Sequence, residues 1–248
     1  EGRMAALGPG VERLAEEATA LWPEARIAIL SSDLAESAQA LKARIDLIAQ
    51  GGADVVIGTQ IVAKGHNFPL LTLVGVIDAD LGLEGGDLRA AEKTFQLIRQ
   101  VAGRAGRAER PGLALIQTFQ PEHPCIRAIL KGDDEGFWRA EASARARAGA
   151  PPYGRMAGVI VTGLDEARTW DVARALGRDG ERLRAAGADV WGPAPAPIAR
   201  VRGRHRVRLL VRAPKGAPLQ AALRGWLAAT PVPGNVRVTV DVDPQSFF

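Results

Sequence analysis

The sequence contains a single cysteine, Cys125, among its 248 residues, and this scarcity removes two classes of protein. One cysteine cannot form a disulfide framework within the chain, and it cannot supply a cysteine-built zinc site. No stretch reaches the roughly 18 unbroken apolar residues of a membrane-spanning helix, and the first residues show no signal-peptide pattern. We therefore expect a reducing, cytoplasmic setting, no membrane partner and no metal site within this chain.

Acidic residues are scarce in the second part of the chain. Residues 1–150 contain 17 lysines and arginines against 20 acidic residues, a formal charge of −3. Residues 151–248 contain 15 against 8, a formal charge of +7. This asymmetry suggests an anionic partner for the second part. A bias toward arginine in a chain rich in alanine and glycine can also reflect genome composition, so charge alone leaves the partner open.

Short apolar runs alternate with helical patterns in the first half of the chain. Strands are expected at 26–30, 53–59, 71–78 and 112–119. Helices are expected at 11–22, 36–50 and 89–103, where apolar residues recur at helical spacing. This alternation predicts an α/β fold with a parallel sheet covered by helices.

A charged helical stretch at 124–148 leads to Pro151-Pro152, which we take as the domain boundary. Beyond it the expected elements are a strand at 155–162, a helix at 165–186, strands at 189–201 and 204–212, a helix at 216–229 and a strand at 235–242. This βαββαβ order is that of a ferredoxin-like α+β domain. The predicted organisation is therefore a first domain at 1–131, a connecting helix at 132–150 and a second domain at 151–248.

The segment GTQIVAKGHNF begins at Gly58 and follows an apolar run. It would form the loop after a parallel strand, where open α/β sheets place their ligand-binding groups. Thr59 and Gln60 offer short donors, Lys64 a cation and Gly65 a permissive backbone. The alternative is an ordinary polar connection.

Residues 100–107 read QVAGRAGR, with two arginines three residues apart among small side chains. If the segment closes a helix, one face carries Gln96, Gln100, Arg104 and Arg107. Two permanently charged, forked donors suit a phosphoryl group that gains negative charge during transfer. The alternative is a solvated helix end whose cations the helix dipole favours. The glutamine and the two glycines favour the phosphate site.

Together the two segments resemble the second half of a superfamily 2 helicase motor. The positions similar to motif V are Thr59, Gln60, Lys64, Gly65 and, where the superfamily has an acid, Asn67. The positions similar to motif VI are Gln100, Gly103, Arg104 and Arg107. The resemblance implies a catalytic role for Arg107, Arg104 and Gln100. It implies nucleotide contacts for Gly65, Asn67 and Gly103, and DNA contacts for Thr59, Gln60 and Lys64.

Further segments are similar to the primosomal protein N′ family of bacterial replication-restart helicases. They are KGHNFP (64–69), IDADLGL (77–83), DLRAAEKTFQLIRQVAGRAGR (87–107), QTFQPEHP (117–124), GPAPAPIARVRGRHRVRLLVR (192–212) and VDVDP (240–244). The resemblance implies a RecA-like second helicase lobe followed by the family's C-terminal domain. It also implies ATP and Mg²⁺ as cofactors of the intact protein. The implied partners are forked and single-stranded DNA, the single-strand-binding protein, primosome proteins and a first helicase lobe.

Three features of that family have no counterpart in the sequence: the Gly-Lys-Ser/Thr loop that binds ATP, the DEAH-type metal motif and the zinc-binding cysteines. The chain also opens EGRMAALGPG, with glutamate where an initiator methionine would stand. We therefore expect a C-terminal segment of a longer helicase that hydrolyses no ATP on its own.

Five arginines alternate with other residues between positions 200 and 208. On a single strand, this period would place all five guanidinium groups on one face. Like charges repel unless an anion lies across them, so we expect Arg202, Arg204 and Arg206 to bind a DNA backbone. The alternative is a solvated face with a turn at Gly203 that splits the row.

Aromatic residues are few in the second domain. Apart from the two terminal phenylalanines, they are Tyr153, Trp170, Trp191 and Trp226. They leave a base-stacking platform open as a possibility. Trp226 lies on an apolar helical face, where we expect it in the core.

Two other functions stay open. The chain could be a non-catalytic module that binds DNA or the acidic tail of the single-strand-binding protein. It could also be an unrelated α/β enzyme that uses Asp78, Asp80 or His66. An ATPase assay with and without a first helicase lobe separates these hypotheses.

Overall fold

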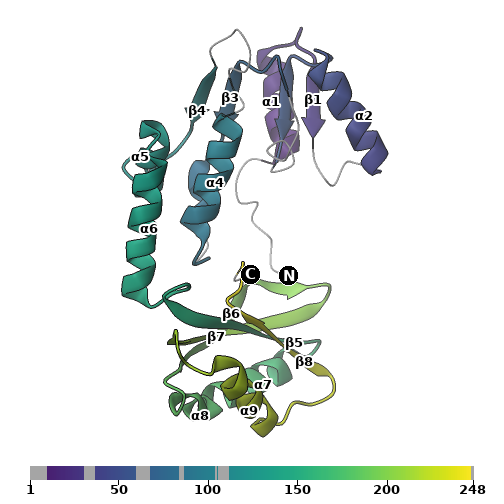
Figure 1. The fold of residues 1–248 in the computed structure, drawn as a ribbon. Helices are drawn as coiled ribbons and strands as arrows, with labels where there is room; N and C mark the ends of the chain where they lie inside the picture. The colour runs from purple at the N-terminus through teal and green to yellow at the C-terminus, as the bar shows by residue number, and fades with distance from the viewer. Residues whose placement is uncertain are drawn as a thin grey trace. The chain divides into compact units, whose positions relative to one another are not determined.

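The computed structural model describes residues 10–30, 37–59, 68–83, 87–103, 105 and 112–246. The chain forms two compact units (Figure 1). The first contains the elements from α1 to β4 together with α5. The second contains α6, the strands β5 to β8 and their helices, and it also includes residues 87–90.

The first unit alternates helices and strands. Its elements are α1 (Val11–Leu21), β1 (Ile27–Leu30), α2 (Ala38–Ala49), β2 (Val55–Gly58), β3 (Leu73–Val76), the 3₁₀ helix η2 (Ala79–Gly82), α4 (Ala90–Ala102), β4 (Leu113–Ile116) and α5 (Pro124–Lys131). β1 pairs with β2 and β3 with β4, both in parallel. Among the described residues the four strands therefore form two parallel pairs, where a single sheet was expected.

The pair β1–β2 is held by a small core and by one ion pair. Leu30, Ile45, Ile48 and Phe68 are buried together, so α2 packs on β1 through residues three positions apart on its apolar face. Arg26 and Asp54 precede the two strands, and Nη2 of the arginine lies 2.7 Å from Oδ1 of the aspartate. Hydrogen bonds from the Arg26 side chain and backbone lower the pKa of Asp54 to about 2.

The second unit is a four-stranded antiparallel sheet with its helices. Its elements are α6 (Asp134–Ala148), β5 (Gly154–Gly163), α7 (Glu166–Asp179), α8 (Glu181–Arg184), β6 (Asp189–Val201), β7 (Arg204–Pro214), α9 (Leu219–Ala229) and β8 (Val236–Val242). The strand order is β6-β7-β5-β8, and every neighbouring pair is antiparallel. Each central strand therefore has a core-facing set of residues and an outward-facing set.

Helices α7, α8 and α9 lie on one side of this sheet (Figure 1). The core between them includes Val159, Val161, Leu209, Leu176 and Trp226, all at 2% exposure or less. The indole Nε1 of Trp226 donates a hydrogen bond to the Leu176 carbonyl at 3.1 Å. The expected core position of Trp226 is confirmed.

The helix expected at 124–148 is two helices. Gly132 ends α5 in the left-handed conformation, with φ of 67°. Asp133 then starts α6, since its side chain accepts a hydrogen bond from the backbone N–H of Gly136 at 2.9 Å. A C-terminal glycine followed at once by an N-terminal aspartate cap stops one helix and starts the next.

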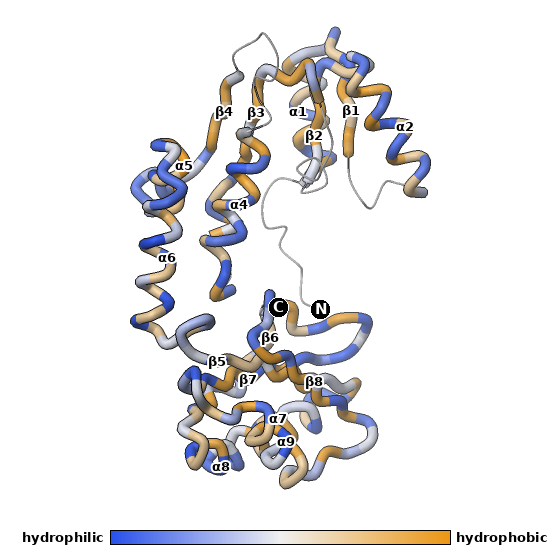
Figure 2. The backbone as a smooth tube through the Cα atoms, viewed as in Figure 1, coloured by the Kyte–Doolittle hydropathy of each residue, from blue (hydrophilic) through white to orange (hydrophobic). Residues whose placement is uncertain are grey.

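The expected helix at 165–186 is also divided, into α7 and α8, which meet at Gly180. A Cβ atom at Gly180 would lie 2.9 Å from Cγ2 of Val190 on β6, so the close approach of helix and strand requires glycine. None of the described helices is long and apolar enough to cross a bilayer. In Figure 2, β1 is hydrophobic over most of its length, whereas α6 mixes hydrophilic and weakly hydrophobic residues.

Candidate functional site

The motif V segment begins where β2 ends. The ladder of β1 and β2 closes with Leu30 opposite Gly58, so both strands end at the same edge. Thr59 follows directly and is exposed. It therefore lies at the carboxyl end of a parallel strand, as the sequence predicted. The other motif V positions and the neighbouring histidine lie outside the described residues: Gln60, Lys64, Gly65, His66 and Asn67.

The motif VI segment begins in the last turns of α4. Phe95 and Ile98 on this helix are buried, whereas Gln96 and Gln100 are exposed. The two glutamines are four residues apart and share the solvent-facing side. The glutamine half of the predicted polar face is therefore accessible to a ligand.

Gly103 follows α4, and its N–H donates to the Arg99 carbonyl at 3.0 Å. A Cβ atom at this position would lie 3.1 Å from that carbonyl oxygen, so a larger residue would press on the helix end. Arg104 and Arg107 lie outside the described residues, and their catalytic roles stay predictions.

Asp80, which an unrelated enzyme could have used as its acid, has both carboxylate oxygens engaged. The hydroxyl of Thr118 donates to Oδ1 and the N–H of Phe119 donates to Oδ2, each at 2.6 Å. The Thr118 bond, followed by the Phe119 bond, lowers the pKa of Asp80. The side chain is buried and joins the segment after β3 to the segment after β4. This geometry favours a structural role.

Asp78 also forms hydrogen bonds that hold this segment in place. Its backbone φ is 53°, and its side chain accepts from the N–H of Leu81 at 3.3 Å, which starts η2. Its own N–H donates to Oε1 of Gln117 at 3.1 Å. The two aspartates of the IDADLGL segment thus hold the residues after β3 against the residues after β4.

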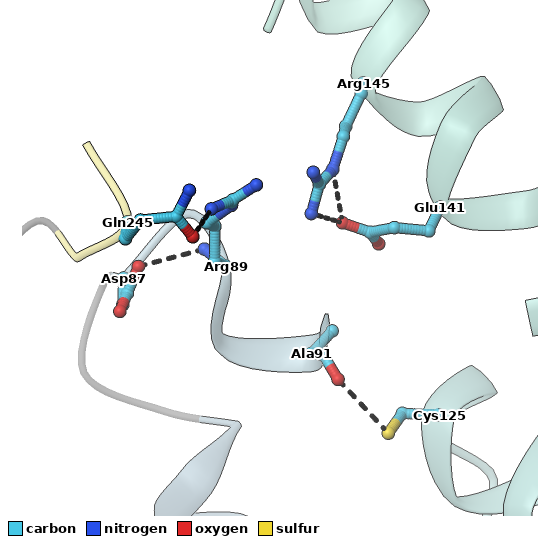
Figure 3. Close-up of polar contacts among 7 residues, drawn as sticks. All are labelled: Asp87, Arg89, Ala91, Cys125, Glu141, Arg145 and Gln245. Carbon is cyan, nitrogen blue, oxygen red and sulfur yellow. Dashed lines mark hydrogen bonds and ion pairs between the residues drawn. The ribbon is translucent and has the colours of Figure 1, made fainter. Parts of the chain in front are cut away.

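A second set of contacts surrounds the start of α4 (Figure 3). The N–H of Arg89 donates to Oδ1 of Asp87 at 3.0 Å, and the Arg89 guanidinium donates to the side-chain oxygen of Gln245. The segment before α4 is therefore tied to the C-terminal end of β8 within the second unit. Figure 3 also shows the buried Sγ of Cys125, 3.6 Å from the Ala91 carbonyl.

The arginine row at 200–208 does not lie on one strand. Arg202 and Gly203 have φ of 48° and 78° and form the two-residue turn between β6 and β7. Arg200 therefore lies on β6, opposite His205, while Arg204 begins β7 opposite Val201. The expectation of five guanidinium groups on one face is wrong, because a glycine at the centre allows the chain to reverse.

Three of the arginines nevertheless share a face. On β7, the alternate residues Val207, Leu209, Val211 and Ala213 are buried toward the helices. The remaining alternate positions of β7 lie on the opposite face: Arg204, Arg206, Arg208, Leu210 and Arg212. We call this side of the four-stranded sheet the outer face.

Strand pairing adds an arginine of β8 to the outer face. Thr162 on β5 lies opposite Arg206, and Arg237 on β8 lies opposite Thr162. Arg237 is thus two strands from Arg206 on the same side. In the next row, Ile160 lies between Arg208 and a threonine of β8. Among the described residues, no carboxylate forms an ion pair with Arg204, Arg206, Arg208 or Arg237, whereas Arg212 pairs with Asp189.

The other end of the outer face has a different character. Trp191 on β6 lies opposite Leu210, and the residue is 48% exposed. The Arg212 guanidinium carbon lies 4.7 Å from the centre of that ring, and its Nη2 lies 3.6 Å from Oδ2 of Asp189. Asp241 on β8 pairs with Gly158 in the same row as Trp191. Among the described residues of the outer face, carboxylates therefore occur only at this end.

The sequence of this region has no acidic residue from position 190 to position 240, although it holds nine lysines and arginines. The alternation around Gly203 pointed to five of them in the sequence, and three of these five, Arg204, Arg206 and Arg208, lie on the outer face. Arg237 and Trp191 could not be joined to the site from the sequence, since only the strand register brings them to it.

The chain is similar to proteins of known family. Residues 146–245 match the family model described as the primosomal protein N C-terminal domain. A protein named Replication restart protein PriA from Rickettsia conorii is 40% identical over 241 residues, which cover 97% of this chain and 37% of the relative. The protein of that name from Treponema pallidum is 39% identical over 96% of this chain and 36% of its own length.

The protein of the same name from Bacillus subtilis is 37% identical over 88% of this chain and 27% of its own length. The chain thus spans between 27% and 37% of the length of these three relatives, in their C-terminal part.

Proposed function

We propose that the chain is the C-terminal part of an ATP-dependent DNA helicase. Residues 146–245 match the primosomal protein N C-terminal domain family, and most of the chain is similar to the C-terminal part of proteins named Replication restart protein PriA. The intact protein would use ATP and Mg²⁺ to reload the replication machinery at stalled forks in the cytoplasm. This C-terminal part would supply the half of the ATP site that contains motifs V and VI, together with a DNA-binding domain.

The first unit would be a RecA-like second helicase lobe. Parallel strand pairs, the exposed Thr59 at the end of β2 and the exposed Gln100 near the end of α4 support this proposal. Motif V would contact both DNA and nucleotide, so that hydrolysis is coupled to movement along the strand. Arg104 and Arg107 would reach the transferring phosphoryl group from across an interlobe cleft, and their small neighbours would let the lobes close.

The second unit would be a ferredoxin-like DNA-binding domain, and the strand order β6-β7-β5-β8 around a βαββαβ chain supports this assignment. The observation that carries DNA binding is the outer face, where Arg204, Arg206, Arg208 and Arg237 form no ion pair with any carboxylate that the structure describes. Four mutually repelling guanidinium groups are best stabilised by phosphates. Arg202, in the exposed turn, would extend the same contact.

A non-catalytic module is the second candidate function. The same basic face would attract the acidic tail of the single-strand-binding protein, a proposed partner beside other primosome proteins. A tail would bind through few carboxylates, whereas a nucleic acid would engage the whole row. The two candidates therefore differ in how binding responds to salt and to single substitutions.

We predict that the chain binds forked DNA with a strong salt dependence. If all four arginines contact phosphates, the logarithm of affinity should fall with the logarithm of salt concentration with a slope of about −3.6. Arg204→Ala should reduce the magnitude of that slope by about one. Fluorescence anisotropy with labelled forked DNA at several salt concentrations measures both.

Arg224→Ala is the matched control, because Arg224 is exposed on α9 rather than on the outer face. Binding that ignores salt and Arg204→Ala, but is displaced by an acidic peptide, would favour the non-catalytic module.

A further inference from the structure

The outer face carries arginines at one end and a tryptophan with two aspartates at the other. Helices α7, α8 and α9 cover only the opposite side (Figure 1). Successive arginines on β7 lie about 7 Å apart, and Arg237 lies about 10 Å across the sheet from Arg206. The arginines are therefore spread over a basic area of the sheet and are not gathered at one point. An extended anion with repeated charges fits such an area.

The aromatic end of the same face offers a different contact. Trp191 is half-exposed although it is the largest apolar side chain of the outer face. The Arg212 guanidinium at 4.7 Å covers one side of its ring and is itself held by a hydrogen bond to the Ala148 carbonyl at 3.2 Å. The ring is therefore supported on one side by Arg212. A supported and accessible indole is suited to stacking on a flat ring.

We infer that the outer face binds single-stranded DNA, with phosphates on the arginine area and an unpaired base stacked on Trp191. The inference rests on the proposed DNA-binding function and names its substrate class. Base faces are buried by neighbouring bases in a duplex, so an exposed tryptophan gains a stacking partner only from an unpaired strand. Four-stranded sheets with aromatic residues on their open face bind single-stranded nucleic acids in this way.

The distribution of charge sets the orientation of the strand. Asp189 and Asp241 lie in the rows at the tryptophan end and repel phosphates there. No carboxylate lies in the rows of Arg206 and Arg208. The backbone is therefore held at the arginine end, and the uncharged bases extend toward Trp191. A duplex would bring a second charged backbone over the aspartates.

The test uses the whole chain, a fluorescein-labelled 20-mer of thymidine nucleotides and a blunt duplex of the same length. Trp191→Leu is expected to weaken binding of the single strand about tenfold or more and to leave duplex binding nearly unchanged. Trp191→Phe, which keeps an aromatic ring, is expected to retain part of the affinity. Arg237→Ala is expected to lower the salt slope for the single strand by about 0.7.

Two controls separate stacking and charge from general effects. Trp170 on α7 lies 5.5 Å from the Arg174 guanidinium, so Trp170→Leu removes a similar pair from the helical side. Arg224→Ala removes an arginine from α9. Both variants are expected to bind the single strand as the unchanged chain does. Circular dichroism melts confirm that each variant is folded.

Three outcomes would overturn the inference. If the chain binds DNA but Trp191→Leu and Arg237→Ala bind like the unchanged chain, the outer face is not the single-strand site, and the proposed function survives. If both variants weaken duplex binding as much as single-strand binding, the ligand is a duplex. If the unchanged chain binds neither DNA, the inference and the DNA-binding part of the proposed function fail together.

Discussion

Arg107→Ala is expected to lower ATP turnover about a thousandfold or more in a protein that joins this chain to a first helicase lobe. An arginine finger neutralises charge that appears on the transferring phosphoryl group only in the transition state, so its loss acts on the rate of hydrolysis. DNA affinity should stay close to that of the unchanged protein, since DNA contacts are assigned to other residues. Phosphate release with saturating DNA, and anisotropy with labelled DNA, measure the two properties.

Arg104→Ala is the comparison that tests the assignment of roles. Both arginines belong to QVAGRAGR, and both are proposed to act in catalysis. If Arg107→Ala kept near-normal turnover while Arg104→Ala lost it, the finger would be Arg104. If neither substitution changed turnover, motif VI would not contribute to the ATP site, and the similarity to helicases would not extend to the mechanism.

Trp226→Ala is expected to destabilise the second unit by about 3–5 kcal/mol, the range found when large aromatic residues are removed from protein cores. The side chain is 1% exposed and packs between the sheet and α7. Truncation leaves a cavity and also removes the hydrogen-bond donor of the Leu176 carbonyl. Urea denaturation followed by circular dichroism gives the free energy of unfolding.

Trp191→Ala is the matched control for this prediction, because Trp191 is half-exposed and belongs to the outer face. It should cost much less stability while it weakens single-strand binding. Equal losses of stability from the two substitutions would mean that the assigned core does not hold the domain together.

The sequence predicted the order of elements because apolar periodicity and glycine or proline signals are local. The β5-to-β8 unit illustrates this, since each of its strands lies within a few residues of the expected position. The same local signals were misread at Gly132-Asp133, where a glycine end and an aspartate cap divide what looked like one charged helix. At Arg202-Gly203 the structure shows the alternative that the sequence offered, a turn that splits the arginine row, instead of the expected single strand.

The candidate sites were predictable to different degrees. Motif spacing predicted roles for Thr59 and Gln100, which stay predictions, and the structure shows both residues exposed, just after a strand and near the end of a helix. The structural role of Asp80 was not predictable, since its partners Thr118 and Phe119 lie nearly forty residues away in sequence. Strand register is equally absent from a single sequence, so Arg237 and Trp191 joined the outer face only once the pairing was known.

ATP hydrolysis by the purified chain, alone and after fusion to the first helicase lobe of a PriA relative, tests the central claim most directly. The chain supplies motifs V and VI but no Gly-Lys-Ser/Thr loop, so it should release no phosphate above background even with forked DNA present. The fusion should hydrolyse ATP, and forked DNA should stimulate it. Robust DNA-stimulated turnover by the chain alone, or a folded fusion that binds ATP and DNA without hydrolysis, would contradict the proposal that this chain is the second half of a helicase motor.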